Sequence, residues 1–232
     1  MPRYIAQFEK GGYTKYISHL DLLRVFKRAF KVMGLDIKYS NGYNPHPKIG
    51  FSQPLSLGYS SLCEYLEFET AAPHDEAGLK ASLSKCLPND IVITDLFLFE
   101  SGVSSLAAES DACEYRISLP YEGTEESFRE LFASYMAQEK ILTLKKMKKT
   151  KTLEEVDIKG KIRSWKVSVE GEDAVIDCIL DSGSHSNLSP ELVIKSFLDF
   201  SKLPLERWDL EVQRVRQFFT DRIQFRHIDN TF

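Results

Sequence analysis

The order in which strand-like and helix-like patterns alternate along the chain is the feature that most restricts its fold. Apolar residues at every second position, or short apolar runs, indicate strands, and apolar residues three and four positions apart indicate helices. In the first hundred residues these patterns follow one another as β-α-β-β-α-β, over residues 3–9, 18–33, 35–40, 61–70, 75–86 and 91–99. This is the order of the ferredoxin-like, RRM-like unit, in which two helices cover one face of an antiparallel sheet.

The same order recurs after a small, polar segment at residues 101–109, which we interpret as a linker. The strand and helix patterns there cover residues 113–119, 124–138, 141–147, 162–169, 174–181, 189–200 and 210–218. We therefore predict an α+β protein with two ferredoxin-like units in tandem, each an antiparallel sheet with helices packed on one face. Their predicted bounds are 1–100 and 110–232, and the second has an extra hairpin strand. The tail at residues 220–232 has no assigned role.

The polar side chains that are most varied and most concentrated lie between Tyr16 and Phe51. This stretch begins with the motif SHLD, in which Ser18 is predicted to cap a helix with Asp21 three residues later. Gly34 is predicted to end that helix. Apolar residues fall on one helix face, and four cations fall on the other: Arg24, Lys27, Arg28 and Lys31.

His19 lies in the first turn of this helix, at the edge of the predicted core. The positive end of the helix dipole disfavours the protonated imidazole there. His19 is therefore a candidate neutral general base or hydrogen-bond partner. The alternative is a structural histidine that bonds a backbone carbonyl.

The motif NPHPK follows the helix, with His46 between Pro45 and Pro47. The two prolines restrict the backbone, so the loop is predicted to be stiff and to hold its side chains in place. A short extended piece is expected at residues 48–51. We expect the loop to fold back against the start of the helix, so that both imidazoles and the arginines share one hollow. The alternative is a structural loop whose Asn and His side chains bond their own backbone.

These motifs define the candidate site. The candidate catalytic residues are His19 and His46. The candidate binding residues are Ser18, His19, Asp21, Arg24, Arg28, Ser40, Asn41, Gly42, Asn44, His46 and Lys48.

Charge is unevenly distributed, although the net charge is only -4. Residues 1–51 carry nine cationic side chains against three carboxylates, a balance of +6. Such asymmetry is typical of polyanion binding. A second basic cluster, at residues 145–151, has the simpler interpretation of a solvated surface.

Composition indicates a globular protein, with 43% hydrophobic and 28% charged residues. No run of eighteen apolar residues predicts a membrane span, and the first ten residues are too polar for a signal peptide. We therefore expect a cytoplasmic protein with no membrane association. The four cysteines form no C-x-x-C pair and are predicted to be free thiols. His19, Asp21 and His46 match no ligand spacing that we can justify, so we predict no metal and no cofactor.

The segments SHLDLLRVFKRAF and YSNGYNPHPKIGFSQPLSLGYSSLCEYLEFE resemble the signature of the bacterial radical-SAM-linked protein family. That family is an uncharacterised domain encoded beside, or fused to, a radical SAM protein. The resemblance is strong over residues 3–69 and looser beyond them. It implies a radical SAM partner and gene neighbours concerned with ribosomes and RNA. This chain has no C-x-x-x-C-x-x-C motif for the iron–sulfur cluster, so it would be the accessory component.

Three hypotheses follow. In the first, the chain is an accessory protein that binds RNA, or presents a substrate, for a radical SAM enzyme that modifies RNA. In the second, it is a metal-independent endoribonuclease, similar in plan to CRISPR repeat-processing enzymes. His19 would then be the general base, and Lys48 or Arg28 would stabilise the phosphorane. In the third, it is a scaffold that binds only protein. We favour the first, because the second depends on fold analogy alone.

Overall fold

The computed structural model describes residues 2–99, 105–147 and 150–223. It confirms an α+β fold whose strands are mostly antiparallel. The chain divides into two compact units: residues 1–111 with 216–232 form unit 1, and residues 112–215 form unit 2. Three predicted features fall partly outside the described residues: the start of the linker (101–104), Lys148 and Lys149 of the second basic cluster, and the tail from residue 224.

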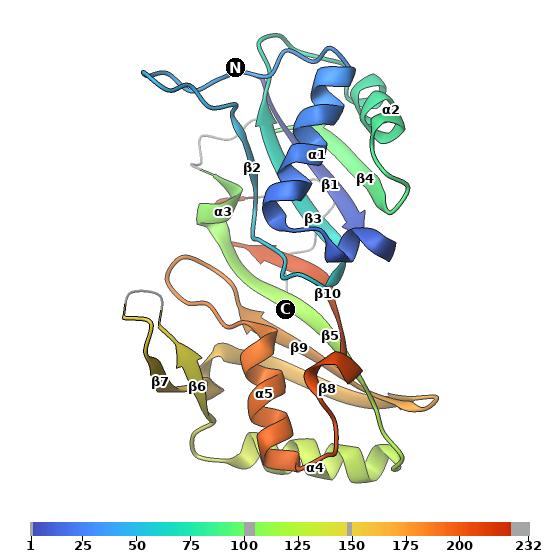
Figure 1. The fold of residues 1–232 in the computed structure, drawn as a ribbon, viewed down its shortest axis with the longest axis vertical. Helices are drawn as coiled ribbons and strands as arrows, with labels where there is room; N and C mark the ends of the chain where they lie inside the picture. The colour runs from blue at the N-terminus through green and yellow to red at the C-terminus, as the bar shows by residue number, and fades with distance from the viewer. Residues whose placement is uncertain (1, 100–104, 148–149, 224–232) are drawn as a thin grey trace. The chain divides into compact units, whose positions relative to one another are not determined.

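Unit 1 contains the N-terminal strands and helices of the chain (Figure 1). Its elements are β1 (Arg3–Lys10), α1 (His19–Val32), β2 (Ile49–Phe51), β3 (Ser60–Glu69), α2 (Glu76–Cys86), β4 (Ile91–Leu98) and α3 (Leu106–Glu109), with a 3-10 turn at Gly12–Tyr16. β1 pairs with both β3 and β4, and β2 pairs with β3. The strand order is therefore β4-β1-β3-β2, and every one of these pairings is antiparallel.

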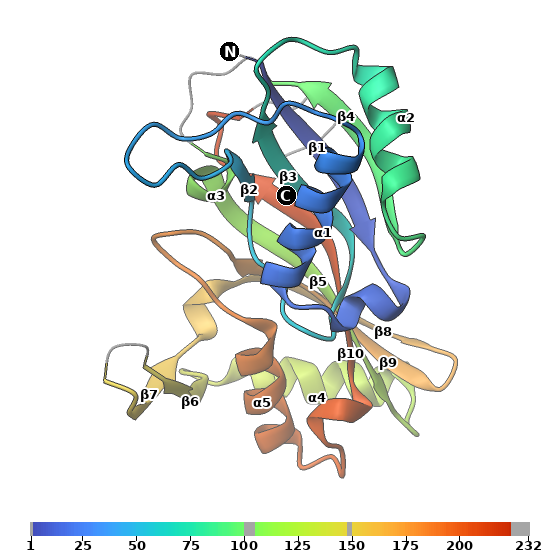
Figure 2. The ribbon, with the colours of Figure 1, turned by 45° about the horizontal axis from the view of Figure 1, so that its top comes forward.

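Apolar residues at alternate positions of β1 and β3 explain why α1 and α2 cover one face of this sheet (Figure 2). Phe8 and Phe68 are buried on that face, and Phe26 and Phe30 of α1 pack against them. A second cluster lies on the opposite face, where Leu106 of α3 is fully buried beside Tyr65. The other face is thus partly covered by the segment that the sequence indicated only as a linker.

Unit 2 contains the remaining elements, most of β5 and the first part of β10. These are β5 (Ser110–Pro120), α4 (Glu125–Ala137), β6 (Leu142–Lys146), β7 (Leu153–Asp157), β8 (Ile162–Glu170), β9 (Asp173–Asp181), α5 (Pro190–Ser201) and β10 (Glu211–Phe219), with 3-10 turns at Lys159–Lys161 and Arg207–Asp209. β9 pairs with β5 and with β8. Phe128 and Phe132 of α4 pack against Phe197 of α5 in its core.

Two predicted strands differ from the structure. Residues 35–40 form no strand but only isolated bridges, Ile37 with Thr70 and Tyr39 with Pro47. The predicted strand at 141–147 is present as β6, but it pairs with β7 in a separate two-stranded sheet. β7 was not predicted, because its sequence LEEVD is short and mostly charged. The extra element is therefore a complete hairpin rather than one strand.

Candidate functional site

The first turn of α1 is fixed by the cap that the sequence predicted. The Ser18 hydroxyl accepts a hydrogen bond from the Asp21 amide at 3.2 Å and donates one to the Asp21 carboxylate at 2.7 Å. Arg24 donates to the same carboxylate at 2.6 Å. These hydrogen bonds, from Ser18 first and then from Arg24, lower the pKa of Asp21. Ser18, Asp21 and Arg24 therefore form one exposed network at the start of the helix.

His19 points from this turn toward the sheet. Its ring lies 5.1 Å from the ring of Phe51, in an edge-to-face arrangement. Partial burial, and then the charge of Lys10, lower the pKa of His19 below 6.5. The imidazole is therefore neutral at pH 7, as the sequence suggested. Burial is the larger of the two causes.

The predicted cationic face of α1 is present as an exposed stripe of four side chains, which we call the basic stripe: Arg24, Lys27, Arg28 and Lys31. Their spacing of three, four and seven residues places them along one side of the helix, over about 10 Å. The apolar residues Leu22, Phe26, Ala29 and Phe30 are buried on the opposite side. The basic stripe therefore faces solvent, because the apolar side of α1 is packed in the core of unit 1.

Hydrogen bonds join the two ends of the loop between α1 and β2. The Ser40 amide donates to the His46 carbonyl at 2.8 Å, and the His46 amide donates to the Ser40 hydroxyl at 3.0 Å. The Lys48 amide donates to the Lys38 carbonyl at 2.7 Å. We call residues 39–47 the pinned loop. These bonds restrict the backbone of the loop in addition to the two prolines.

The side chains of the pinned loop remain exposed. Tyr43 is fully solvent-exposed and Tyr39 is about half exposed. Asn41, Asn44 and His46 are exposed too, and none of these three side chains makes a hydrogen bond with the described residues. Within the described residues, the bonds that close the loop use backbone groups and the Ser40 hydroxyl, so the Asn and His side chains do not stabilise its backbone.

The structure does not bring His19 and His46 together. His19 contacts Phe51 at one end of β2, whereas the pinned loop joins β2 beyond its other end, at Lys48. Both ribbon views show the loop extending from the end of the sheet at which α1 stops. α1 has fourteen residues, so its two ends lie about 20 Å apart. The prediction that His19 and His46 share one hollow is therefore wrong.

The arrangement required by the endoribonuclease hypothesis is also absent. His19 and Arg28 are nine residues apart on α1, about two and a half turns, so they lie on opposite sides of the helix. Lys48 lies just before β2, at the end away from Phe51, and bonds Glu69. His19 therefore has neither of the cations that the hypothesis assigned to the phosphorane.

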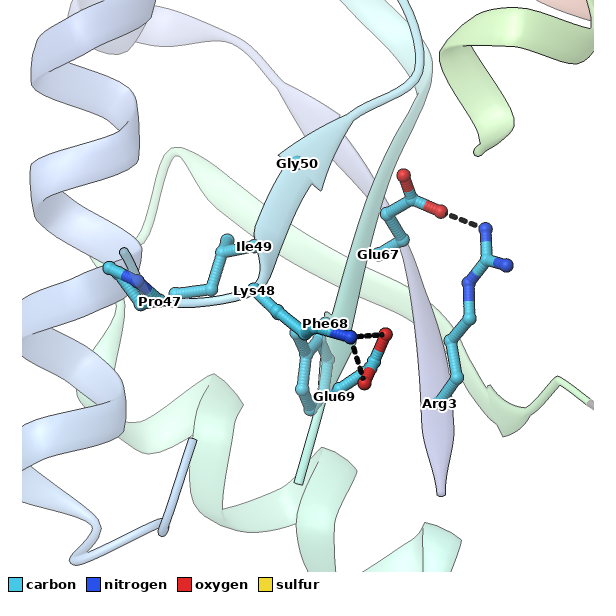
Figure 3. A pocket seen from close by; sticks show the side chains of 8 residues that line it. All are labelled: Arg3, Pro47, Lys48, Ile49, Gly50, Glu67, Phe68 and Glu69. Carbon is cyan, nitrogen blue, oxygen red and sulfur yellow. Dashed lines mark hydrogen bonds and ion pairs between the residues drawn. The ribbon is translucent and has the colours of Figure 1, made fainter. Parts of the chain in front are cut away.

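A pocket of about 250 Å³ lies at the base of the pinned loop, lined by β1, β2 and β3 (Figure 3). Lys48 Nζ contacts both carboxylate oxygens of Glu69 at 2.9 Å. Arg3 forms an ion pair with Glu67, which also accepts a hydrogen bond from the Leu106 amide at 3.2 Å. Cations and carboxylates therefore alternate around the opening.

Strand register explains this pocket. Arg3 lies directly opposite Glu69, and Gly50 lies directly opposite Glu67. Because Gly50 has no side chain, its position on the sheet face is empty. A Cβ built there would lie 3.5 Å from Glu67 Oε1, which is ordinary contact. The pocket thus exists because glycine leaves this position of the sheet face open, and ion-paired side chains surround it.

Sequence reasoning found only Lys48 among the charged residues of the pocket and missed Arg3, Glu67 and Glu69. The two glutamates alternate with apolar residues of β3, so their shared face could be expected from the period of two. Their meeting with Arg3 and Gly50 depends on cross-strand register, which no local pattern gives.

Within the described residues, no three His, Cys, Asp or Glu side chains are grouped as a metal site would require. Cys63, Cys113 and Cys178 are buried, and none of the four cysteines is joined in a disulfide. Burial raises the pKa of Cys178 to about 12. No helix of the described residues is long and apolar enough to span a membrane.

Comparisons with known proteins place this geometry in context. A family model described as "Uncharacterized protein conserved in bacteria (DUF2344)" matches residues 3–190. No curated protein matches the chain. A chain in the crystal structure of a Cbf5-Nop10-Gar1 complex is similar at 13% identity and a TM-score of 0.48. The match covers 94% of this chain and 50% of that one, so this chain spans half its length. An unknown protein from Galdieria sulphuraria is similar at 10% identity and a TM-score of 0.28, over 92% and 96% of the two chains. Neither likeness carries a functional argument.

Proposed function

The chain belongs to this bacterial family of uncharacterized proteins, and from that premise we propose that it is an accessory RNA-binding protein. The observation that carries the proposal is the basic stripe of Arg24, Lys27, Arg28 and Lys31. Four exposed cations along one side of a rigid helix, with a single paired carboxylate beside them, suit a phosphate backbone. The stripe supplies affinity without sequence preference.

The pinned loop supports the same proposal. Proteins that bind single-stranded nucleic acid combine a basic surface with aromatic side chains on which bases stack. Tyr39 and Tyr43 are exposed on a loop whose backbone is fixed, so stacking on them costs little ordering entropy. Asn44 and His46 have exposed polar groups for a ribose or a base edge.

We infer further that both units are ferredoxin-like. In unit 1 the support is the element order and the antiparallel strand order β4-β1-β3-β2. In unit 2 the same arrangement is obtained from β5, α4, β8, β9, α5 and β10 if the β6-β7 hairpin is treated as an insertion.

The proposed enzymatic partner is a radical SAM protein that modifies RNA. The support is the resemblance of the SHLD and NPHPK segments, together with the absence of a cluster-binding cysteine motif in this chain. This chain would then hold the RNA while the partner supplies the chemistry. Co-purification of the two proteins, with and without ribonuclease treatment, tests the partnership.

Charge reversal on the basic stripe tests RNA binding. Arg24→Glu with Arg28→Glu changes two exposed side chains and is expected to weaken RNA binding at least ten-fold, because about two phosphate contacts become repulsive. Lys85→Glu with Lys195→Glu is the matched control, with the same charge change at exposed positions on α2 and α5. Fluorescence anisotropy with a labelled RNA measures both. Equal affinity of the two variants, or no binding by the parent protein, would overturn the proposal; the latter would favour a protein-binding scaffold.

A further inference from the structure

The pocket beside the pinned loop has a chemistry that the basic stripe does not explain. Its charged side chains come from β1, from β3 and from the residue just before β2, and all four are at least partly buried. The side chains of Arg3 and Glu67 are 14% and 15% exposed, and those of Lys48 and Glu69 are 39% and 23% exposed. Charged groups held this closely lose little further entropy when a ligand replaces one of their contacts. A pocket built in this way is preorganised for a ligand with both donors and acceptors.

The hydrogen-bond acceptors and donors that face the pocket indicate which ligand it can bind. Glu67 uses Oε2 for Arg3 and for the Leu106 amide, and its Oε1 accepts no hydrogen bond from the described residues. Oε1 is also the atom nearest to the empty position beside Gly50. A ligand that enters this space therefore meets a carboxylate acceptor on one side. On the other side it meets the ammonium of Lys48, a partly exposed donor that Glu69 holds in place.

Size limits the choice further. A volume of about 250 Å³ lies below the range of about 300–1,000 Å³ that is usual for drug-sized ligands, so one small ring system fits and a whole nucleotide does not. Among the RNA bases, guanine presents two adjacent N–H donors, N1 and N2, next to the acceptor O6. A carboxylate that accepts from the two donors, with a cation at O6, is the complement of that edge.

We propose that this pocket, lined by Lys48, Glu67, Glu69 and Gly50, receives an unpaired guanine base of a bound RNA. The inference rests on the proposed RNA-binding function and adds a base preference to it. Glu67 Oε1 accepts from the guanine N–H groups, and Lys48 donates to O6. Because the pocket uses the edge that pairs with cytosine, the guanine must be single-stranded. The pinned loop leads directly into Lys48, so a strand that stacks on the loop is led to the pocket.

The closing experiment compares three labelled single strands of nine nucleotides that differ only at the centre: all uridine, one guanosine, or one inosine. Inosine lacks the 2-amino group and therefore one of the two donors. Anisotropy is expected to show about ten-fold tighter binding of the guanosine strand than of the uridine strand, with inosine in between. Equal binding of all three strands would overturn the base preference and leave the proposed RNA-binding function intact.

A pair of glycine variants separates the pocket from the rest of the protein. Gly50→Ala places a methyl group in ordinary contact with Glu67 Oε1, where the base would have to approach, and is expected to remove the guanosine preference while uridine binding stays the same. Gly160→Ala has open space around it and should keep the preference. If Gly50→Ala keeps the guanosine preference, the base is recognised at another place and the proposal is overturned.

Free guanosine gives a readout that does not depend on RNA binding. In NMR spectra of the parent protein it should shift the signals of Gly50 and of its strand neighbours, and cytidine should not. If no RNA binds but guanosine shifts these signals, the proposed function fails and the pocket assignment stands. If RNA binds but guanosine leaves Gly50 unchanged, the base pocket fails and the function stands.

Discussion

At the scale of single residues, His19 illustrates how context decides a role. An imidazole in the first turn of a basic helix invites a catalytic interpretation, but the ring packs on Phe51 and faces away from the basic stripe. Its low pKa follows from burial and from the nearby charge of Lys10. The neutral imidazole therefore contributes to the core edge, and its protonation is coupled to folding.

This coupling predicts a pH dependence of stability. The pKa of His19 is lowered in the folded protein, so the unfolded chain binds more protons between that pKa and 6.5. The stabilisation is complete above pH 6.5 and is lost as the pH falls through the folded pKa. Urea unfolding at several pH values should show this loss in the parent protein and a smaller one in His19→Gln. An identical pH profile for both proteins would contradict the assignment.

A second residue-scale prediction concerns the cap of α1. Ser18→Ala removes the hydroxyl that satisfies the Asp21 amide, and should cost about 1 kcal/mol of unfolding free energy. Ser18→Thr keeps a hydroxyl that can accept from the Asp21 amide and donate to the Asp21 carboxylate, and should retain most of that stability. Denaturant unfolding measures both. A loss as large in Ser18→Thr as in Ser18→Ala would show that the cap hydrogen bonds are not the cause.

At the scale of helices and strands, the sequence predicts an element correctly where its apolar period and its capping residues lie within the element itself. The bounds of α1, with Ser18 as its cap and Gly34 just beyond its end, were predicted because capping chemistry is local. The alternation in residues 35–40 predicts a strand, but only Ile37 and Tyr39 make bridges. The Ser40 amide and the Lys38 carbonyl bond residues 46 and 48 instead, whereas the Lys38 amide donates to the Glu69 carbonyl and the Asp36 carbonyl accepts from the Ala71 amide. These partners lie outside the segment, so its own pattern does not indicate them.

The pinned loop is the element whose ordered backbone should matter most for the proposed binding of RNA. Ser40→Ala removes the acceptor of the His46 amide while leaving the backbone bond between the same two residues. We expect a weaker affinity for single-stranded RNA, by about two- to five-fold, because the loop must be ordered on binding. Unfolding free energy should change little, since the loop is exposed. Anisotropy together with denaturant unfolding checks both parts, and an unchanged affinity would show that the loop order does not matter.

At the scale of the whole molecule, the first 51 residues carry a positive balance in a chain whose overall net charge is -4. Such a distribution favours polyanion binding at the positive segment. This asymmetry can be counted directly from the residues. The pocket could not be foreseen, because Arg3 of β1, Glu67 of β3 and Lys48 just before β2 are brought together by a strand register that is set only by folding.

The most direct test of the central claim is the salt dependence of RNA affinity, measured on the parent protein and on Arg24→Glu with Arg28→Glu. Four phosphate contacts from the basic stripe predict a slope of about -3 for the logarithm of the binding constant against the logarithm of salt concentration, and the variant should lose about half of that slope. A slope near zero in the parent protein, or equal slopes in the two proteins, would contradict the account.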